Sequence, residues 1–218
     1  MAAFGAGAFG GDWSVPPDGY IFEATAACRE DAARAAMAAR PGDARYDVCA
    51  DQMAIFARGL EEARRSDKLL LVTFGATWCA WCTSLQKQLP SNELLGHTAQ
   101  AFDFGRGLHH VEIGISTTSK GAKDEIPSGN AVLRLVLARV PGVELRAIPF
   151  IAVIDPANRD RVVARNIDDL ALTGQGRFDP VRLRDVLHRA HVFVRTGSSP
   201  PAVEPGWILR KLTRWWYG

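Results

Sequence analysis

The chain has 218 residues, enough for one domain with a sizeable core plus terminal extensions. Its formal net charge of +2 argues against a general nucleic-acid binder, and 47% hydrophobic with 23% charged residues is typical of a globular protein. A membrane-spanning helix needs a run of about 18 or more apolar residues, and the sequence contains no such run.

The first 50 residues are predicted to form an extended arm and a helical extension. Residues 1–11 are rich in Gly and Ala, but they lack the basic start and the apolar core of a signal peptide. The chain is therefore either cytoplasmic or an exported, periplasmic protein without its leader, and we favour the second interpretation. The spacing predicts a helix over Thr25–Arg40, ended by Pro41 and Gly42.

Cys28 and Cys49 flank this alanine-rich helix. In an oxidising compartment the two could pair as a structural disulfide, and the other interpretation is two unpaired thiols, one or both of them buried.

A second helix is predicted over Asp51–Arg65, where apolar residues recur at helical spacing. The run Leu69–Phe74 is apolar and predicts a buried strand, after which Gly75 and Ala76 break the pattern. Trp78, Cys79, Ala80, Trp81 and Cys82 follow, at the start of a helical segment that reaches Leu89.

Two cysteines at positions i and i+3 of a helix start suit thiol chemistry. Cys79 and Cys82 lie one turn apart on one face, so a disulfide between them needs little backbone movement. The unpaired N–H groups and the positive end of the helix dipole favour a thiolate at Cys79, which is the reactive form. Cys82, one turn further in, is expected to be more covered.

A zinc site is the alternative interpretation of a Cys-x-x-Cys pair, and it needs a second pair of ligands. The candidates are Cys28, Cys49, His97, His109, His110, His188 and His191. His109 and His110 are adjacent, so on a strand they point to opposite faces. His188 and His191 lie at i and i+3 of a predicted helix and could ligate a metal in principle, but a surface-facing pair is the commoner case. We therefore predict no metal.

The remaining elements follow from periodicity and from turn residues. Three strands are expected, over His109–Ile115, Phe150–Ile154 and Arg161–Asn166. Helices are expected after Pro90 with Ser91 as N-cap, over Ala131–Val140, and from Pro180 to Phe193 with Asp179 as N-cap. We expect a loop over Thr117–Asn130 and a turn over Pro156–Asp160.

Residues 196–218 are predicted to be a linker followed by a basic aromatic tail. Trp207–Tyr217 mixes three basic residues with four aromatic ones. One interpretation is a short helix that makes a peripheral membrane or protein contact. We favour the other, in which the tail docks on its own domain and buries its tryptophans.

Two signatures resemble the thioredoxin superfamily: Trp78-Cys79-x-x-Cys82 after an apolar strand, and Ile148-Pro149 before another. The resemblance covers Asp51 to Val194 and is greatest to bacterial thioredoxin-like proteins with an N-terminal extension. It implies an α/β fold, with a central mixed sheet flanked by helices, over residues 51–195.

The resemblance also implies roles for the site residues. Cys79 would attack a substrate disulfide and Cys82 would resolve the mixed disulfide. Ile148 and a cis-Pro149 would form the substrate platform, and Trp78 would cover one side of the site. Trp81 is a further candidate for substrate binding, and plain core packing is the alternative for both tryptophans. The expected partners are protein disulfides or dithiols and a redox partner, without a bound cofactor.

The chain departs from the family at two points. Ala80-Trp81 replaces Gly-Pro between the cysteines, and Thr73 stands where thioredoxins carry a buried acid. A hydroxyl is no comparable base near pH 7, which disfavours a general thioredoxin. The sequence therefore predicts a thiol–disulfide oxidoreductase, acting as a dedicated reductase. The alternative is a non-catalytic protein-binding module whose cysteines are structural or carry a metal.

Overall fold

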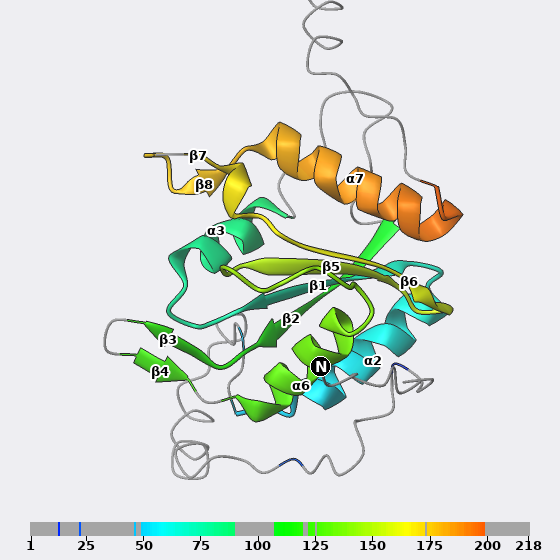
Figure 1. The fold of residues 1–218 in the computed structure, drawn as a ribbon, viewed down its shortest axis with the longest axis horizontal. Helices are drawn as coiled ribbons and strands as arrows, with labels where there is room; N and C mark the ends of the chain where they lie inside the picture. The colour runs from blue at the N-terminus through cyan, green and yellow to red at the C-terminus, as the bar shows by residue number, and fades with distance from the viewer. Residues whose placement is uncertain are drawn as a thin grey trace, which may run out of the picture.

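The structure, a computed structural model, describes Trp13, Phe22, Tyr46 and residues 49–89, 107–119, 122–124, 126–172 and 174–198. Its elements are α2 (Gln52–Arg65), β1 (Leu69–Gly75), α3 (Ala80–Gln88), β2 (Leu108–Gly114), β3 (Thr117–Ser119), β4 (Ala122–Asp124), α6 (Pro127–Leu137), β5 (Phe150–Asp155), β6 (Asn158–Asn166), the 3-10 turn η1 (Asp168–Leu170), β7 (Ala171–Leu172), β8 (Arg177–Phe178) and α7 (Pro180–Thr196) (Figure 1). The helix expected over 25–40, the helix restart at Ser91 and the tail over 207–217 lie outside the described residues.

A four-stranded mixed sheet forms the centre, in the order β2-β1-β5-β6. β1 runs parallel to β2 and antiparallel to β5, and β6 is antiparallel to β5. Helices α2 and α6 cover one face, while α3 and α7 cover the other (Figure 1). This arrangement confirms the predicted α/β class, and it explains why all seven residues of β1 are buried.

Aspartate side chains cap the starts of α2 and α7, and the sequence predicted the cap at Asp179. The Asp51 carboxylate accepts a hydrogen bond from the backbone N–H of Met53 at 2.9 Å, and Asp179 caps α7 in the same way through Val181. α7 runs to Thr196, three residues beyond the predicted end, and stops at Gly197, whose φ of 73° is the left-handed conformation common after helices.

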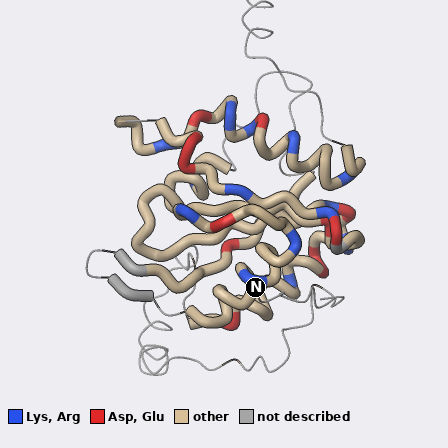
Figure 2. Tube along the Cα trace, in the orientation of Figure 1, with Lys and Arg blue, Asp and Glu red and all other residues tan. Residues whose placement is uncertain are grey.

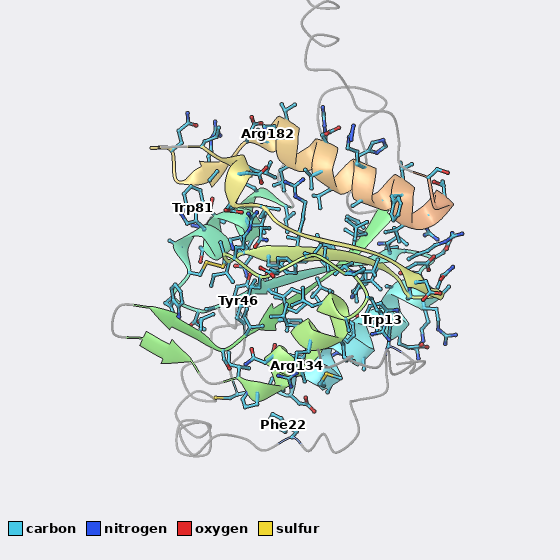
Figure 3. All side chains as sticks on the ribbon, in the orientation of Figure 1. Trp13, Phe22, Tyr46, Trp81, Arg134 and Arg182 are labelled. Atoms are coloured by element: carbon cyan, nitrogen blue, oxygen red, sulfur yellow. A yellow bond between two sulfur atoms is a disulfide. The ribbon has the colours of Figure 1, made fainter. Side chains whose placement is uncertain are left out.

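Trp13 packs on the α2 face of the sheet. Its ring is 2% exposed and packs edge-on against Phe56 with 5.9 Å between centroids. The Arg139 guanidinium carbon lies over the Trp13 ring, 4.0 Å from its centroid. Figure 3 shows Trp13 at the opposite end of the sheet from Tyr46 and Trp81.

The predicted loop over Thr117–Asn130 is wrong. β3 and β4 pair there as a short hairpin, and α6 begins at Pro127, four residues before the predicted Ala131. Pro127 at the first position of α6 is a helix-start signal, but the polar, glycine-containing composition of the segment favoured the prediction of a loop.

The predicted turn over Pro156–Asp160 is too long, because β6 already begins at Asn158. Asp155 pairs with Asn158, and the Asp155 carboxylate accepts a hydrogen bond from the N–H of Ala157 at 2.8 Å. That bond closes a two-residue turn. The short pair β7 and β8 was not predicted, since strands of two residues leave no periodic signal.

No helix in the described part of the chain is both long and apolar enough to span a bilayer.

Candidate active site

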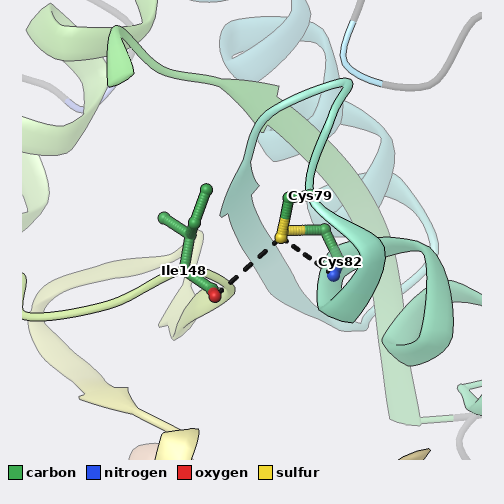
Figure 4. The surroundings of a disulfide bond; sticks show 3 residues. All are labelled: Cys79, Cys82 and Ile148. Carbon is green, nitrogen blue, oxygen red and sulfur yellow. Dashed lines mark hydrogen bonds between the residues drawn. A yellow bond between two sulfur atoms is a disulfide. The ribbon is translucent and has the colours of Figure 1, made fainter. Parts of the chain in front are cut away.

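The two cysteines lie where α3 begins. Cys79 is the N-cap residue, and its Sγ accepts a hydrogen bond from the backbone N–H of Cys82 at 3.0 Å. The two form a disulfide with 5.2 Å between their Cα atoms (Figure 4). Cys79 is 5% exposed and Cys82 is fully buried, as expected for an outer and an inner sulfur.

The segment before β5 faces this disulfide from the other side. The Ile148 carbonyl oxygen lies 3.9 Å from Cys79 Sγ, and the Ile148–Pro149 peptide bond is cis (Figure 4). Sixty-nine positions separate Cys79 from Ile148, and the antiparallel pairing of β1 with β5 brings them together. The two signatures found in the sequence therefore meet at one end of the sheet.

Asn166 holds this segment, and sequence reasoning missed it. Its side-chain oxygen accepts hydrogen bonds from the N–H groups of Arg146 and Ala147 at 2.9 and 3.2 Å, and its amide nitrogen donates to the Glu144 carbonyl at 2.7 Å. Asn166 is 8% exposed. One buried amide on β6 thus satisfies three backbone groups just before Ile148, and an isolated asparagine at a strand end gives no signal of this role.

Replacing Asn166 by alanine is expected to loosen the segment next to the disulfide. Three backbone groups lose their partner, so we expect a loss of about 2–3 kcal/mol in the free energy of unfolding. Thiol–disulfide exchange should slow by about tenfold, because a small displacement of a platform residue is costly. Urea unfolding and the exchange rate measure these effects.

Asn158→Ala is the matched control, since the Asn158 side chain accepts an exposed hydrogen bond from the Asp160 N–H within the β5–β6 turn and makes no contact with the Ile148 segment that the described residues show. Equal effects of the two substitutions on exchange would contradict the platform role of the Asn166 amide.

The two tryptophans of the motif have different environments. Trp78, just before the reactive pair, is 38% exposed. Trp81 is partly buried and packs against Phe178 of β8 with 5.2 Å between ring centroids. Trp81 therefore packs in the core beneath α3, whereas the Trp78 ring has a free surface beside Cys79.

No charged residue occurs between Leu69 and Cys82, and the charges in Figure 2 belong to other segments of the chain. Cys79 and Cys82 thus lie in a stretch of uncharged side chains. The first turn of α3 contains no acidic residue whose negative charge would offset the positive end of the helix dipole.

Thr73, at the position of the family's buried acid, is fully buried and contacts a histidine. Its Oγ1 lies 3.0 Å from Nε2 of His110 on β2. Burial, followed by the charge of His109, lowers the pKa of His110 to about 4, so its imidazole is neutral near pH 7. His109 instead pairs with Glu62 of α2 at 3.1 Å. The two histidines therefore point to opposite faces, as predicted.

Tyr46 is a second residue that sequence reasoning missed. Its side chain is 2% exposed and belongs to a small cluster with Ala76, Cys79 and Cys82. In the sequence it is a lone tyrosine in a polar segment, which gives no signal of a place beside the disulfide.

Of the other cysteines and histidines, the structure describes Cys49, His109, His110, His188 and His191. In the described ranges no three His, Cys, Asp or Glu side chains are grouped so that they could hold a metal ion. Cys49 is disulfide-bonded. Its predicted partner Cys28 lies outside the described residues, so the pairing of these two stays a prediction.

One comparison with known proteins identifies the family of the segment that carries the cysteine pair. A family model described as thioredoxin-like matches residues 51–156. This segment is a thioredoxin-like domain. It contains both cysteines and the Ile148–Pro149 bond, and it ends just after β5. No curated protein and no solved structure matches the chain significantly. A thioredoxin-like domain with a paired Cys79 and Cys82 is consistent with thiol–disulfide redox chemistry.

Proposed function

We propose that the chain is a thiol–disulfide oxidoreductase that reduces disulfides in a small set of protein substrates. The observation that carries the proposal is the geometry at Cys79: an outer sulfur at a helix N-terminus, next to the Ile148 backbone and bonded to a buried Cys82. A helix N-terminus lowers the pKa of a thiol, and accessibility decides which of two thiols attacks first.

Reduction of a substrate takes two exchanges. The Cys79 thiolate attacks one sulfur of the substrate disulfide, and the other substrate sulfur leaves as a thiolate that takes a proton from solvent. The Cys82 thiolate then attacks Cys79 Sγ, which releases the second substrate sulfur and forms the Cys79–Cys82 disulfide. Two electrons have passed to the substrate, and a dithiol partner protein returns them to the enzyme.

The substrate is expected to bind along Ile148 and Pro149. An extended substrate chain could pair with the Ile148 backbone, whose carbonyl already lies against Cys79 Sγ. Trp78, the residue before Cys79, is 38% exposed and offers a further apolar contact. Because Ile148, Pro149 and Trp78 are apolar, we expect substrates with apolar residues beside the disulfide.

The redox equilibrium of the cysteine pair with glutathione tests this proposal. The protein is equilibrated at a series of glutathione ratios, thiols are alkylated, and the peptide with Cys79 and Cys82 is quantified by mass spectrometry. We expect one reversible two-electron transition at a reducing potential. A variant with serine at Cys28 and Cys49 keeps the second disulfide out of the measurement.

Two other outcomes would change the assignment. A reversible transition at an oxidising potential would indicate disulfide formation in place of reduction. A pair that does not exchange at any glutathione ratio would favour a non-catalytic protein-binding module.

A further inference from the structure

A small space beside Gly75 separates Tyr46 from the buried sulfur. A methyl group on Gly75 would lie 2.8 Å from Cys82 Sγ and 2.8 Å from the Tyr46 hydroxyl oxygen. Both atoms therefore border the same few ångströms of space, and only a residue without a side chain fits between them. Figure 3 shows Tyr46 at the end of the sheet where α3 begins.

The Tyr46 hydroxyl is buried and makes no hydrogen bond of normal geometry among the described residues. A buried hydroxyl without a partner costs about 1–3 kcal/mol, so such a group calls for a physical reason. The backbone of Tyr46 is also left-handed, with a φ of 53°, which is unfavourable for a bulky residue. The fold thus tolerates two costs to hold this phenol next to Cys82.

The disulfide is a poor acceptor for that hydroxyl, whereas a thiolate is a strong one. Resolution of a mixed disulfide requires a thiolate at Cys82, deep in the protein, where burial disfavours the charge. A neutral donor aimed at the sulfur would offset this cost. Burial raises the pKa of Tyr46 well above its usual range, and the nearby Thr73 hydroxyl opposes this only in part. The phenol therefore keeps its proton and remains a donor.

We propose that Tyr46 is a positioning residue for resolution, and that its hydroxyl donates a hydrogen bond to the Cys82 thiolate. This role rests on the proposed function. In the step itself the Cys82 thiol loses its proton to solvent, and its thiolate attacks Cys79 Sγ. The bond from Cys79 to the substrate breaks, and the substrate sulfur leaves with the electron pair and takes a proton from solvent. Tyr46 neither gains nor loses a proton.

Two other titratable side chains interact with Thr73 or Tyr46, and neither replaces this donor. His110 is engaged with Thr73 at 3.0 Å, and Glu112 acts on Tyr46 as a negative charge that raises the phenol pKa. A carboxylate near a thiolate would oppose ionisation, so the hydroxyl of Tyr46 is the group suited to stabilise it.

Tyr46→Phe tests the role because it removes one oxygen and keeps the ring. The reduced protein is mixed with a chromogenic aromatic disulfide, which releases one coloured thiolate when Cys79 reacts and a second when Cys82 resolves. We expect the first release to be unchanged and the second to be about tenfold slower at pH 7. Its pH profile should move up by about one unit, because a hydrogen bond to a charged group contributes at least that much.

Ser128→Ala is the matched control. It also removes one buried hydroxyl, which accepts a hydrogen bond from the Gln52 N–H on the α2 side of the sheet. Its effect should fall on stability, with both releases unchanged. A second variant carries meta-fluorotyrosine at position 46, whose more acidic hydroxyl should speed the second release without altering the packing.

The outcomes separate this inference from the proposed function. If wild type releases two thiolates and Tyr46→Phe matches it at every pH, the role of Tyr46 is overturned and the oxidoreductase stands. If wild type releases only one thiolate, the pair does not resolve and the proposed function itself fails.

Discussion

Cys79→Ser is expected to reduce the rate of disulfide reduction by at least about a thousandfold, because the variant loses the attacking thiolate. A serine hydroxyl at the N-cap of α3 still accepts the Cys82 N–H, so the helix start should survive. Activity should therefore disappear without loss of the fold. Insulin reduction, followed by turbidity, and circular dichroism measure the two properties.

The reciprocal substitution separates attack from resolution. Cys82→Ser keeps the outer Cys79 sulfur, so we expect it to accumulate mixed disulfides that a reductant releases, whereas Cys79→Ser should accumulate none. A variant with serine at both Cys28 and Cys49 is the control, and it should reduce insulin like wild type. Substantial insulin reduction by Cys79→Ser would refute the role of this cysteine as nucleophile.

Gly129→Ala is expected to destabilise the fold by about 3 kcal/mol or more, as overpacking against a rigid backbone does. Gly129 lies in the first turn of α6, and a methyl group there would overlap the backbone carbonyl oxygen of Gly114 on β2. The backbone cannot rotate away, since Gln52 accepts a hydrogen bond from the Gly114 N–H at 2.9 Å. The helix would have to move off the sheet. Urea unfolding measures the loss.

Gly59→Ala is the matched contrast, because Gly59 is also a helical glycine facing β2. There a methyl group would meet the side chain of Val111, not backbone. Replacing glycine by alanine favours the helical conformation by about 1 kcal/mol at either position. The Val111 side chain can shift away from the added methyl group at a smaller cost than backbone can. We therefore expect a much smaller loss for Gly59→Ala. Similar losses for the two variants would show that the contact of α6 with β2 is less rigid than the structure indicates.

Local signals sufficed where one segment carried its own pattern. The apolar run of β1, the periodicity of α2 and the cap at Asp179 are short-range features, and the structure has them as predicted. The hairpin of β3 and β4 was missed for the converse reason. Strands of three polar residues have no periodicity, and they exist because they pair with each other.

The residues around the disulfide also include some that a continuous motif indicates and others that only contacts between distant segments bring into place. The sequence indicated Cys79, Cys82, Ile148 and Pro149, because both motifs are continuous in the chain. It identified Thr73 as the position of the missing acid, but it did not connect Thr73 with His110, which lies 37 positions away on β2. That contact depends on the register of two parallel strands, in which Thr73 pairs with Glu112.

The sequence by itself determined where most of the strands and helices lie, and that a helix starts at a pair of cysteines, because these follow from periodicity, caps and spacing. The mixed sheet between helices was expected only from the resemblance to the thioredoxin superfamily. Only the tertiary structure decided what surrounds the sulfurs: the Ile148 carbonyl at Cys79, the Asn166 amide behind it and the Tyr46 hydroxyl beside Cys82. These contacts join segments that are far apart in the chain. Their free energy arises from burial and hydrogen bonding between those segments, so no single stretch of sequence encodes them.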